Sequence, residues 1–350
     1  MDTSAGSDFI STVAAESGLT GEQRPLGEPA VLKLLDAHYG VGGRLHRIPT
    51  EKDETFRLED RGSTSLVKLS SPDEDPALVN LQTACMEHLE WTAPELPVQR
   101  LVRSLAGTGE VVVPAAEGPY DRVLRVMRFM PGRLLASHAP SADQLRQCGS
   151  SLARLATALE GFDHPRADRM LIWDLKHFHR MRPLLEYVGE AGKRALAENI
   201  FDQFDETVAP LLDTLSSHVI HGDFSPFNVL VDPGASHYVA GVIDFGDVVR
   251  SPRIFDISVA MANQLGADPE NPWDSALPIA EGYHSLCPLS PQELRALTVS
   301  APARLLLRAL ITGWRAALQP EARDYLFSHS AKDWDRLAST AAAPAPSIAS

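Results

Sequence analysis

The hydrophobic residues in the first part of the chain follow two different periods. Short apolar runs that alternate with polar residues and are bounded by polar turns are typical of strands. The strand-like runs are RLHRIP (44–49), TFRLE (55–59), STSLVKLS (63–70), LPVQRLV (96–102), GEVVVPA (109–115) and YDRVLRVMRFM (120–130). Residues 30–40 and 75–93 instead have the spacing of amphipathic helices. The side of the second helix that we expect in the core carries Leu78, Leu81, Cys85, Met86 and Leu89.

The rest of the chain is mainly helical in pattern. The helical stretches are 141–162, about 173–215 and most of 274–338. The apolar runs 229–231 and 238–243 interrupt them and predict a β-hairpin.

These patterns predict an α+β fold with two lobes, the layout of a two-lobed kinase. We expect a small β-rich lobe over residues 29–131 and a larger, mainly helical lobe over 132–340, joined near MRFMPG (127–132). Residues 1–28 are rich in Ser, Gly, Thr and Glu, so we expect a loose tail with at most one short helix. The low-complexity residues 341–350 form a second expected tail.

Composition narrows the class of protein. Net charge is −14 and no Lys/Arg cluster occurs, which argues against a nucleic-acid partner. No apolar run has the length of a membrane span, and the N-terminus has no signal-peptide pattern. The three cysteines are widely spaced, which argues against disulfides and structural zinc and favours a cytoplasmic protein. The acidity either keeps the protein soluble or attracts cationic small molecules.

The candidate chemistry lies on and beside the predicted hairpin. HGDFSPFN (221–228) places Asp223 five residues before Asn228, and the second hairpin strand ends at Asp244. Phosphoryl transfer needs a base near the acceptor hydroxyl and Mg²⁺ ligands across the donor phosphates, and Mg²⁺ prefers oxygen ligands. This Asp, Asn and Asp set supplies one base and two metal ligands.

HGDFSPFN and IDFG (243–246) resemble the H-x-D-x-x-x-x-N and metal-binding segments of the aminoglycoside phosphotransferase/choline kinase family of small-molecule kinases. Residues 31–58, 161–175 and 241–260 look most similar to its hydroxylysine kinase branch, and the likeness extends from about residue 30 to 310. The resemblance implies a protein-kinase-like fold, ATP or GTP as donor and a small, usually amine-bearing acceptor. It makes Asp223 the catalytic base and makes Asn228 and Asp244 the Mg²⁺ ligands.

The same resemblance suggests residues that hold the nucleotide. Lys68 lies in the apolar strand SLVKLS, where it is either an exposed alternating residue or the lysine that contacts the α- and β-phosphates. Its usual partner is a helix glutamate, and that position falls on Gln82. Glu87, five residues further along the helix, faces away from it. Gln82 is therefore the expected neutral partner of Lys68.

The loop that would cover the phosphates, TEKDETFRL (50–58), contains no glycine. Thr55 stands where hydroxylysine kinase relatives typically have Asn, and its hydroxyl and amide are candidates for a phosphate contact. In the interlobe linker, the main-chain groups of Arg128 and Met130 are expected to face the nucleobase.

Three residues are candidates for the acceptor site. Asp174 and Trp173 would meet an ammonium group through a carboxylate and a cation–π contact, although a helix-start Asp beside a core Trp explains them equally well. Asp247 is either a substrate or metal contact or a turn residue. We expect Asp256 to brace the catalytic loop and His221 to be a packed residue that shapes it.

The sequence thus predicts a small-molecule kinase whose acceptor is a hydroxylysine-like metabolite. The alternatives are an aminoglycoside, homoserine or choline kinase, or a phosphotransferase that modifies a natural product. A nucleotide-binding pseudokinase is disfavoured because Lys68, Asp223, Asn228 and Asp244 all occur together.

Overall fold

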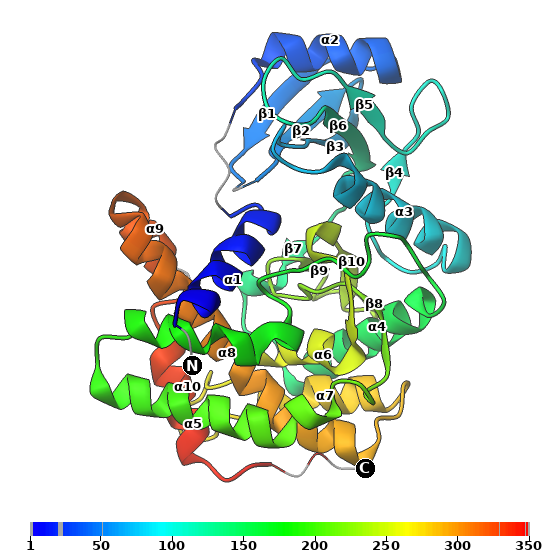
Figure 1. The fold of residues 1–350 in the computed structure, drawn as a ribbon. Coiled ribbons are helices and arrows are strands. Elements are labelled where there is room, and N and C mark those ends of the chain that lie inside the picture. Colours follow the sequence, from blue (N-terminus) through cyan, green and yellow to red (C-terminus); the bar gives the residue numbers. More distant parts are fainter. Residues whose placement is uncertain (1–2, 20–23, 51, 329, 347, 349–350) are drawn as a thin grey trace.

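The computed structural model describes residues 3–19, 24–50, 52–328, 330–346 and 348. The chain forms two lobes, with the sheet-rich lobe standing above a larger helical one (Figure 1). The smaller lobe is made mainly of residues 24–128, and the segment after β6 (Arg122–Arg128) leads into the larger lobe.

The small lobe is built on one antiparallel sheet with two helices. Its strands run in the order β1-β2-β3-β6-β4, and β5 also pairs with β6. The remaining elements are β1 (Arg44–Ile48), β2 (Glu54–Asp60), β3 (Ser63–Leu69), β4 (Leu101–Val102), β5 (Val111–Val113), α2 (Glu28–Tyr39) and α3 (Pro76–Thr92). The Asp75 carboxylate caps α3 by accepting from the Ala77 amide, and Pro76 opens the first turn.

Alternation along the strands gives the sheet two different faces. One face packs against α2 through a core that includes Leu35, Phe56, Val67 and Leu124. The opposite face carries Lys68, which pairs in register with Thr55 on β2 and with Arg125 on β6. Because directly opposed residues project from the same face, these three side chains lie together on the side that looks into the interlobe cleft.

The large lobe is a helical assembly. Its helices are α4 (Ala142–Leu159), α5 (Ala191–Thr207), α6 (Arg253–Ala262), α7 (Leu277–His284), α8 (Pro291–Leu318), α9 (Arg323–Ser328) and α10 (Asp333–Ala342). It also contains the 3₁₀ helices η1 (Leu135–Ser137), η2 (Leu175–Tyr187), η3 (Ala209–Leu211), η4 (Phe245–Asp247) and η5 (Pro320–Ala322). Ser290 and Glu293 form a capping box at the start of α8, which fixes where this long central helix begins.

Short strands at the top of the large lobe hold the candidate catalytic segment. The predicted hairpin is present as β9 (Val229–Val231) paired with β10 (Val239–Val242), and β7 (Arg133–Leu134) adds to its edge. A second pair, β8 (Ser217–Ile220) with β11 (Val249–Pro252), lies on the other side of the loops. The loop after β8 and the loop after β10 meet the small lobe, because Asp223 and Asp244 line one cavity with Lys68 of β3.

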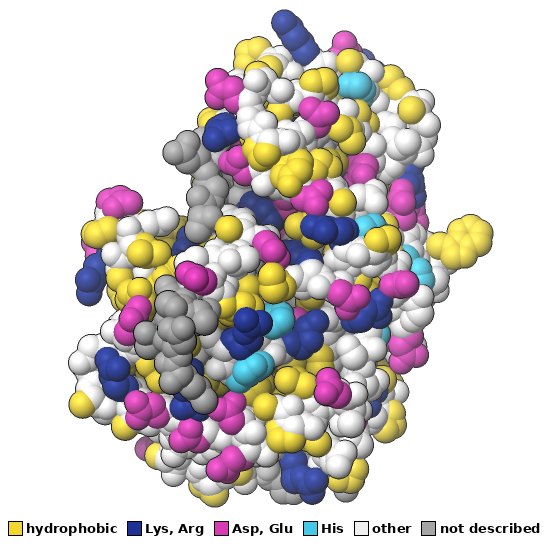
Figure 2. Space-filling model, viewed as in Figure 1, with side chains coloured by type: hydrophobic (Ala, Val, Ile, Leu, Met, Phe, Trp, Pro, Cys, Tyr) yellow, Lys and Arg dark blue, Asp and Glu magenta, His cyan; other side chains and the backbone are white. Residues whose placement is uncertain are grey.

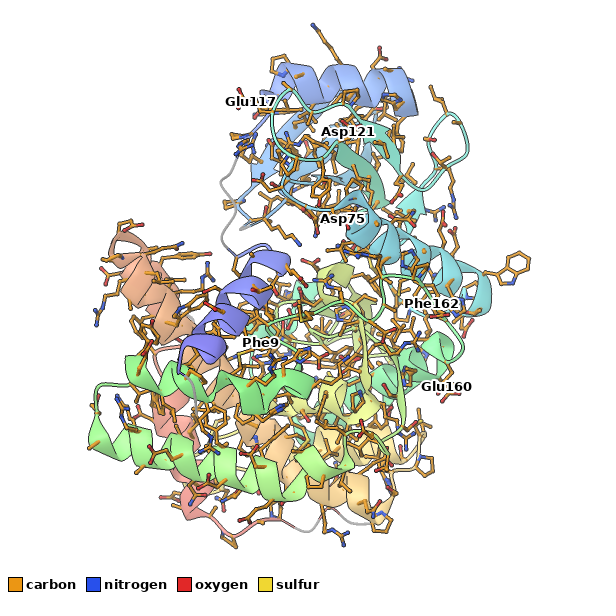
Figure 3. All side chains as sticks on the ribbon, viewed as in Figure 1. Phe9, Asp75, Glu117, Asp121, Glu160 and Phe162 are labelled. Atoms are coloured by element: carbon orange, nitrogen blue, oxygen red, sulfur yellow. The ribbon has the colours of Figure 1, made fainter. Side chains whose placement is uncertain are left out.

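The N-terminal segment contains a helix at its start, which the sequence allowed for, but this helix is packed on the large lobe rather than loose. Residues Thr3–Glu16 form helix α1, which packs on η2 and buries Phe9, Ile10, Val13 and Ala14. Phe9 lies between α1 and the large lobe (Figure 3), where the Arg180 guanidinium stacks on its ring. Polar residues dominate the composition of residues 1–28, so the four apolar residues of α1 were not recognised as a buried helix face. These four residues are sufficient to pack the helix against the large lobe.

The expected long helical stretch over 173–215 is also interrupted. It consists of η2, which contains Pro183, followed by α5 and η3. Proline removes a backbone donor and disfavours a regular α-helix, which explains the tighter turns of η2.

No described helix is long and apolar enough to cross a membrane. On the face drawn in Figure 2, basic and acidic side chains are intermingled along the boundary between the lobes.

Candidate active site

A cavity of about 240 Å³ lies between the lobes and collects most of the residues singled out from the sequence. We call it the catalytic cavity. Lys68 and Gln82 reach it from the small lobe, and Asp223, Asn228 and Asp244 reach it from the loops around the hairpin. Its further lining is Ser17, Leu19, Thr50, Lys52, Asp53, Glu74, Trp173, Gly246 and Asp247.

Asp223 is held in place by the loop that contains it. The Asn228 side-chain amide donates to the Asp223 Oδ2 atom at 2.6 Å and to the Asp223 carbonyl at 3.0 Å. Gly222 precedes it with φ of +80°, and a Cβ atom there would lie 2.2 Å from the Asp247 carbonyl oxygen. Only glycine permits this close approach, which brings the catalytic loop against the segment after β10.

Two other residues brace the same loop. The Asp256 carboxylate accepts from the His221 amide at 2.9 Å and from the Gly222 amide at 2.8 Å. His221 is buried against Phe245, and its Nδ1 atom accepts from the Asp223 amide. The ring proton is therefore on Nε2, which donates to the Ile243 carbonyl. Burial lowers the pKa of His221 to about 4, so the ring is neutral at pH 7. Both residues support the loop, as expected from the sequence.

The environment of Asp223 suits a general base. Burial, together with the nearby Asp247 carboxylate, raises the pKa of Asp223 to about 7, although Arg304 opposes this shift. A base is most effective when its pKa lies near the working pH, because it is then both ionised and able to accept a proton. The Asp223 carboxyl group meets this condition.

Asp244 has the opposite electrostatic setting. Its Oδ1 atom accepts from the Lys68 ammonium at 2.9 Å, and this cation lowers the pKa of Asp244 to about 2. The residue also adopts a backbone φ angle of +64°, which residues other than glycine rarely adopt. Such backbone strain is concentrated at functional sites, where the surrounding structure holds the residue in place.

The oxygen donors in this cavity fit Mg²⁺. The Asp244 carboxylate is ionised, and the Asn228 amide group lies in the same cavity with its nitrogen already engaged by Asp223. Its carbonyl oxygen is the atom of that group suited to a metal. Mg²⁺ is usually bound by one or two protein oxygens together with phosphate oxygens and water, so this donor set is of the right kind.

The surroundings of Lys68 differ from the expected pairing with Gln82. The Gln82 Oε1 atom accepts from the Arg125 guanidinium at 2.8 Å. The Lys68 ammonium lies 2.9 Å from Asp244 and 3.8 Å from the Asp53 carboxylate, which also lies 3.7 Å from Arg125. The expected hydrogen bond from Lys68 to Gln82 is therefore not formed, because Arg125, which lies opposite Lys68 on β6, binds the Gln82 side chain. The negative charge near Lys68 comes from Asp244 and Asp53.

The other residues proposed for the nucleotide are Thr55, Arg128 and Met130, and they do not line the catalytic cavity. Thr55 is buried opposite Lys68, and its hydroxyl lies 3.3 Å from that of Thr50. The Arg128 amide donates to the Arg100 carbonyl at 2.8 Å, so this amide is not available to a nucleobase. The predicted contact between the Arg128 main chain and the nucleobase is therefore limited to the Arg128 carbonyl. Met130 lies in the linker beyond β6, and its predicted contact with the nucleobase stays a prediction.

The acceptor residues predicted from sequence are separated by the fold. Asp174 is buried away from the catalytic cavity, where it accepts from the Ser251 hydroxyl and the Lys176 amide and caps η2. These contacts agree with the alternative of a helix-start Asp, and an acceptor role for Asp174 stays a prediction. Trp173 does line the catalytic cavity, but the Arg304 guanidinium lies 5.2 Å from its ring centroid. Asp247 lines the cavity beside Asp223, as the sequence suggested.

Several residues of the site were missed at the level of sequence. They are Asp53, Lys52, Glu74, Arg125, Arg169 and Arg304. Lys52 and Asp53 lie in the loop 50–58 that was expected to cover the phosphates, although neither residue was singled out there. The other four come from separate segments and carry no shared motif. Among them the available signal was Arg125, since a charged residue in the middle of an apolar strand is unusual.

The architecture and the site are those of a kinase-like phosphotransferase. They combine two lobes, a hairpin at the cleft and one cavity that contains Lys68, Asp223, Asn228 and Asp244. The chain belongs to the phosphotransferase enzyme family, whose model matches residues 22–297. Hydroxylysine kinase of Mus musculus is 25% identical over 327 residues, which cover 87% of this chain and 86% of that protein. The acceptor group of this enzyme class is a hydroxyl, as expected from the sequence.

Solved structures show the same fold. The microcompartment-associated aminopropanol kinase matches with a TM-score of 0.68 at 18% identity, covering 90% of this chain and 96% of that one. Amicoumacin kinase hAmiN, solved in complex with AMP-PNP, Ca²⁺ and Ami, matches with a TM-score of 0.67 at 16% identity, covering 91% and 95%. The α+β, protein-kinase-like fold predicted from the sequence is confirmed.

Proposed function

We propose that this small-molecule kinase transfers the γ-phosphoryl group of ATP or GTP to a hydroxyl of an amine-bearing acceptor, most closely a hydroxylysine-like metabolite. The observation that carries the proposal is the convergence of Lys68, Asp223, Asn228 and Asp244 on one cavity. The similarity to hydroxylysine kinase over 87% of the chain supports the choice of acceptor.

The roles follow from the electrostatics of the cavity. The Asp223 carboxylate accepts the acceptor's hydroxyl proton, and its pKa of about 7 keeps a large fraction ionised at neutral pH. Lys68 leaves its contact with Asp244 to meet the donor phosphates, since a phosphate oxygen offers the ammonium a comparable charge-assisted bond. Asn228 and Asp244 hold Mg²⁺, which when bound neutralises charge on the phosphates.

The acidic side of the cavity supports an amine-bearing acceptor. Asp247 lies beside Asp223, and after burial its carboxylate is the next cause of the raised pKa of Asp223. Burial and the Asp244 carboxylate raise the pKa of Asp247. A cationic group on the acceptor would relieve the repulsion among these carboxylates when it binds, and a cavity shielded from water strengthens that attraction.

The experiment is a panel of hydroxyl-bearing amines with ATP and GTP, scored by release of nucleoside diphosphate. The Asp223→Asn variant should lower kcat by about 10²–10⁴-fold, the usual contribution of a general base, while still binding nucleotide. Asp213→Asn, an exposed residue of the large lobe, is the matched control.

Turnover by Asp223→Asn within about threefold of the control would refute the assignment of the base. If the enzyme phosphorylates an aminoglycoside, homoserine or choline in preference to hydroxylysine, its function is that of the corresponding kinase instead. Nucleotide binding with no phosphorylation of any acceptor would favour a pseudokinase.

A further inference from the structure

Lys68 lies between two carboxylates that come from different lobes. Its ammonium is 2.9 Å from Asp244, which follows β10, and 3.8 Å from Asp53, which directly precedes β2. The Lys68 and Asp53 side chains are both mostly buried, 12% and 11% exposed. Asp244 is the residue proposed above to hold Mg²⁺, and a carboxylate bound to a metal is no longer free to hold Lys68. Asp53 is the acidic partner that Lys68 then keeps.

A second buried cation increases the need for this carboxylate. Arg125 is 1% exposed and lies directly opposite Lys68 in the pairing of β3 with β6, so two positive side chains project from the same face of the sheet. Like charges at directly opposed positions destabilise a sheet. The Asp53 Oδ2 atom offsets this repulsion, because it lies 3.7 Å from Arg125 as well as 3.8 Å from Lys68. Gln82, which accepts a hydrogen bond from Arg125, carries no charge that could do the same.

The protonation of Lys68 reflects the same balance of charges. Burial lowers the pKa of Lys68, and the Arg125 charge lowers it too, but the Asp244 and Asp53 carboxylates raise it above its ordinary value. Lys68 is therefore a protonated ammonium at neutral pH, the form that binds a phosphate oxygen.

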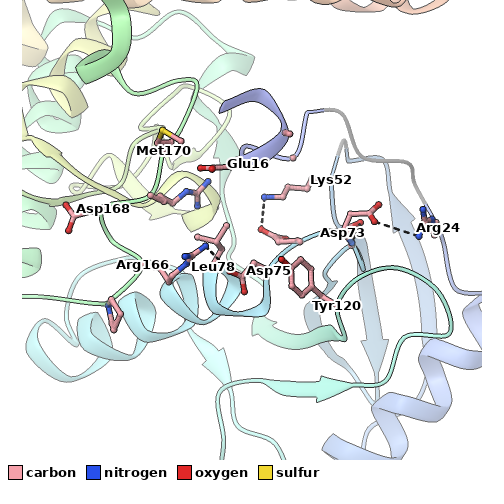
Figure 4. A pocket seen from close by; sticks show the side chains of 16 residues that line it. Glu16, Arg24, Lys52, Asp73, Asp75, Leu78, Tyr120, Arg166, Asp168 and Met170 are labelled. Carbon is pink, nitrogen blue, oxygen red and sulfur yellow. Dashed lines mark hydrogen bonds and ion pairs between the residues drawn. The ribbon is translucent and has the colours of Figure 1, made fainter. Parts of the chain in front are cut away.

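Contacts of the neighbouring residues hold Asp53 in position. Lys52, the preceding residue, lies 2.6 Å from Glu74 in the turn before α3, and the dashed line from Lys52 in Figure 4 marks this ion pair. The Glu74 side chain is buried, so Lys52 is attached to the interior of the protein rather than to a surface residue. The Thr50 hydroxyl also donates to the Asp53 carbonyl. The Asp53 carboxylate is thus fixed beside the two cations.

We propose that Asp53 positions Lys68 for the donor phosphates, the task that the sequence analysis expected of Gln82. The inference rests on the role that the proposed function gives to Lys68, and it adds the residue through which that role is maintained. Asp53 retains the ammonium at the cavity when Asp244 turns to the metal. Without Asp53, Lys68 would keep Asp244 as its acidic partner and would compete with Mg²⁺ for that carboxylate.

The test measures binding of a nonhydrolysable donor, AMP-PNP or GMP-PNP, by calorimetry over a series of Mg²⁺ concentrations. Asp53→Asn should weaken this binding by about tenfold, the effect of losing one buried charged contact, and should raise the Mg²⁺ concentration needed for half-maximal binding. Asp53→Glu should remain within about threefold of wild type, because it keeps the carboxylate. Asp36→Asn, at an exposed position of α2, is the matched control and should bind as wild type does.

A second arm separates positioning of Lys68 from a general structural role. In a Lys68→Ala background, adding Asp53→Asn should weaken nucleotide binding by less than about twofold, because the group through which Asp53 acts is already missing. Asp53→Asn by itself leaves Arg125 as a buried charge with no acidic partner, which can prevent folding. Comparing Arg125→Gln with the double variant Arg125→Gln/Asp53→Asn removes that cation from both proteins, so the loss of binding between them measures the same contribution.

Tighter nucleotide binding by Asp53→Asn would show that this carboxylate repels the phosphates, and it would overturn the inference. An equal loss of binding with and without Lys68 would overturn it as well, since Asp53 would then act on the fold alone. Both results leave the proposed function intact as long as Lys68→Ala by itself weakens nucleotide binding. If Lys68→Ala binds nucleotide as wild type does, the phosphate contact proposed for Lys68 is wrong, and this inference falls with it.

Discussion

The pH dependence of turnover should report directly on the pair of carboxylates at the centre of the cavity. Burial and the Asp247 charge raise the pKa of Asp223 to about 7. Asp223 accepts a proton only when it is ionised, so activity should fall as the pH drops below this value. At pH 6, one unit below it, roughly one tenth of the base is ionised, and kcat/KM should fall to about a tenth of its plateau.

Asp247→Asn tests whether the neighbouring carboxylate causes part of this shift. Removing a negative charge beside Asp223 favours its ionised form, so the pKa of Asp223 should fall and the acid limb of the profile should move to lower pH. The variant should then keep a larger fraction of its plateau activity at pH 6 than the wild type does. Steady-state rates between pH 5 and 9, each normalised to its own plateau, measure this difference.

Titration of the nucleotide and the acceptor affects both proteins equally, so the comparison isolates the protein group. An acid limb at the same pH in wild type and Asp247→Asn would show that the two carboxylates do not interact. A wild-type profile that stays flat down to pH 5 would refute the raised pKa of Asp223.

Three further predictions follow from contacts in the large lobe and the cavity. Asp244→Ala should abolish Mg²⁺-dependent binding of nucleotide in calorimetry, with Asn228→Ala acting in the same direction more weakly, and normal binding by the Asp244 variant would disprove its metal role. Asp174→Ala should lower the free energy of unfolding by about 1–3 kcal/mol while leaving the acceptor KM within about twofold, because the residue caps η2. Glu293→Ala should cost about 3–5 kcal/mol in denaturant unfolding, since it leaves Arg253 without its two short bonds of 2.7 and 2.9 Å, and a loss below 1 kcal/mol would show that the pair is not structural.

Local periodicity predicted much of the fold. The apolar stripe of α3 is buried as expected, and the runs 229–231 and 238–243 form the hairpin, because both depend on side chains close together in sequence. The motif residues Asp223, Asn228 and Asp244 lie in one cavity for the same reason, since they flank the two strands of this hairpin.

Contacts between distant segments were beyond the reach of the sequence. The bond between Gln82 and Arg125 depends on the register of β3 with β6, which no local pattern specifies. The hydrogen bond from Ser251 to Asp174 joins residues 77 positions apart, so the sequence could not show that this carboxylate has a partner inside the protein. Arg169 carries no motif and is distinguished only by its burial and its unpaired donors.

Helix α1 also bears on how acceptor choice can change over evolutionary time. The family match begins at residue 22, yet Ser17 and Leu19, which directly follow α1, line the catalytic cavity. Part of the wall of the catalytic cavity is thus contributed by a segment outside the residues that the family model matches. Substitutions in this segment can alter which molecule is admitted without disturbing the loop that performs the chemistry, so specificity and catalysis are free to diverge independently.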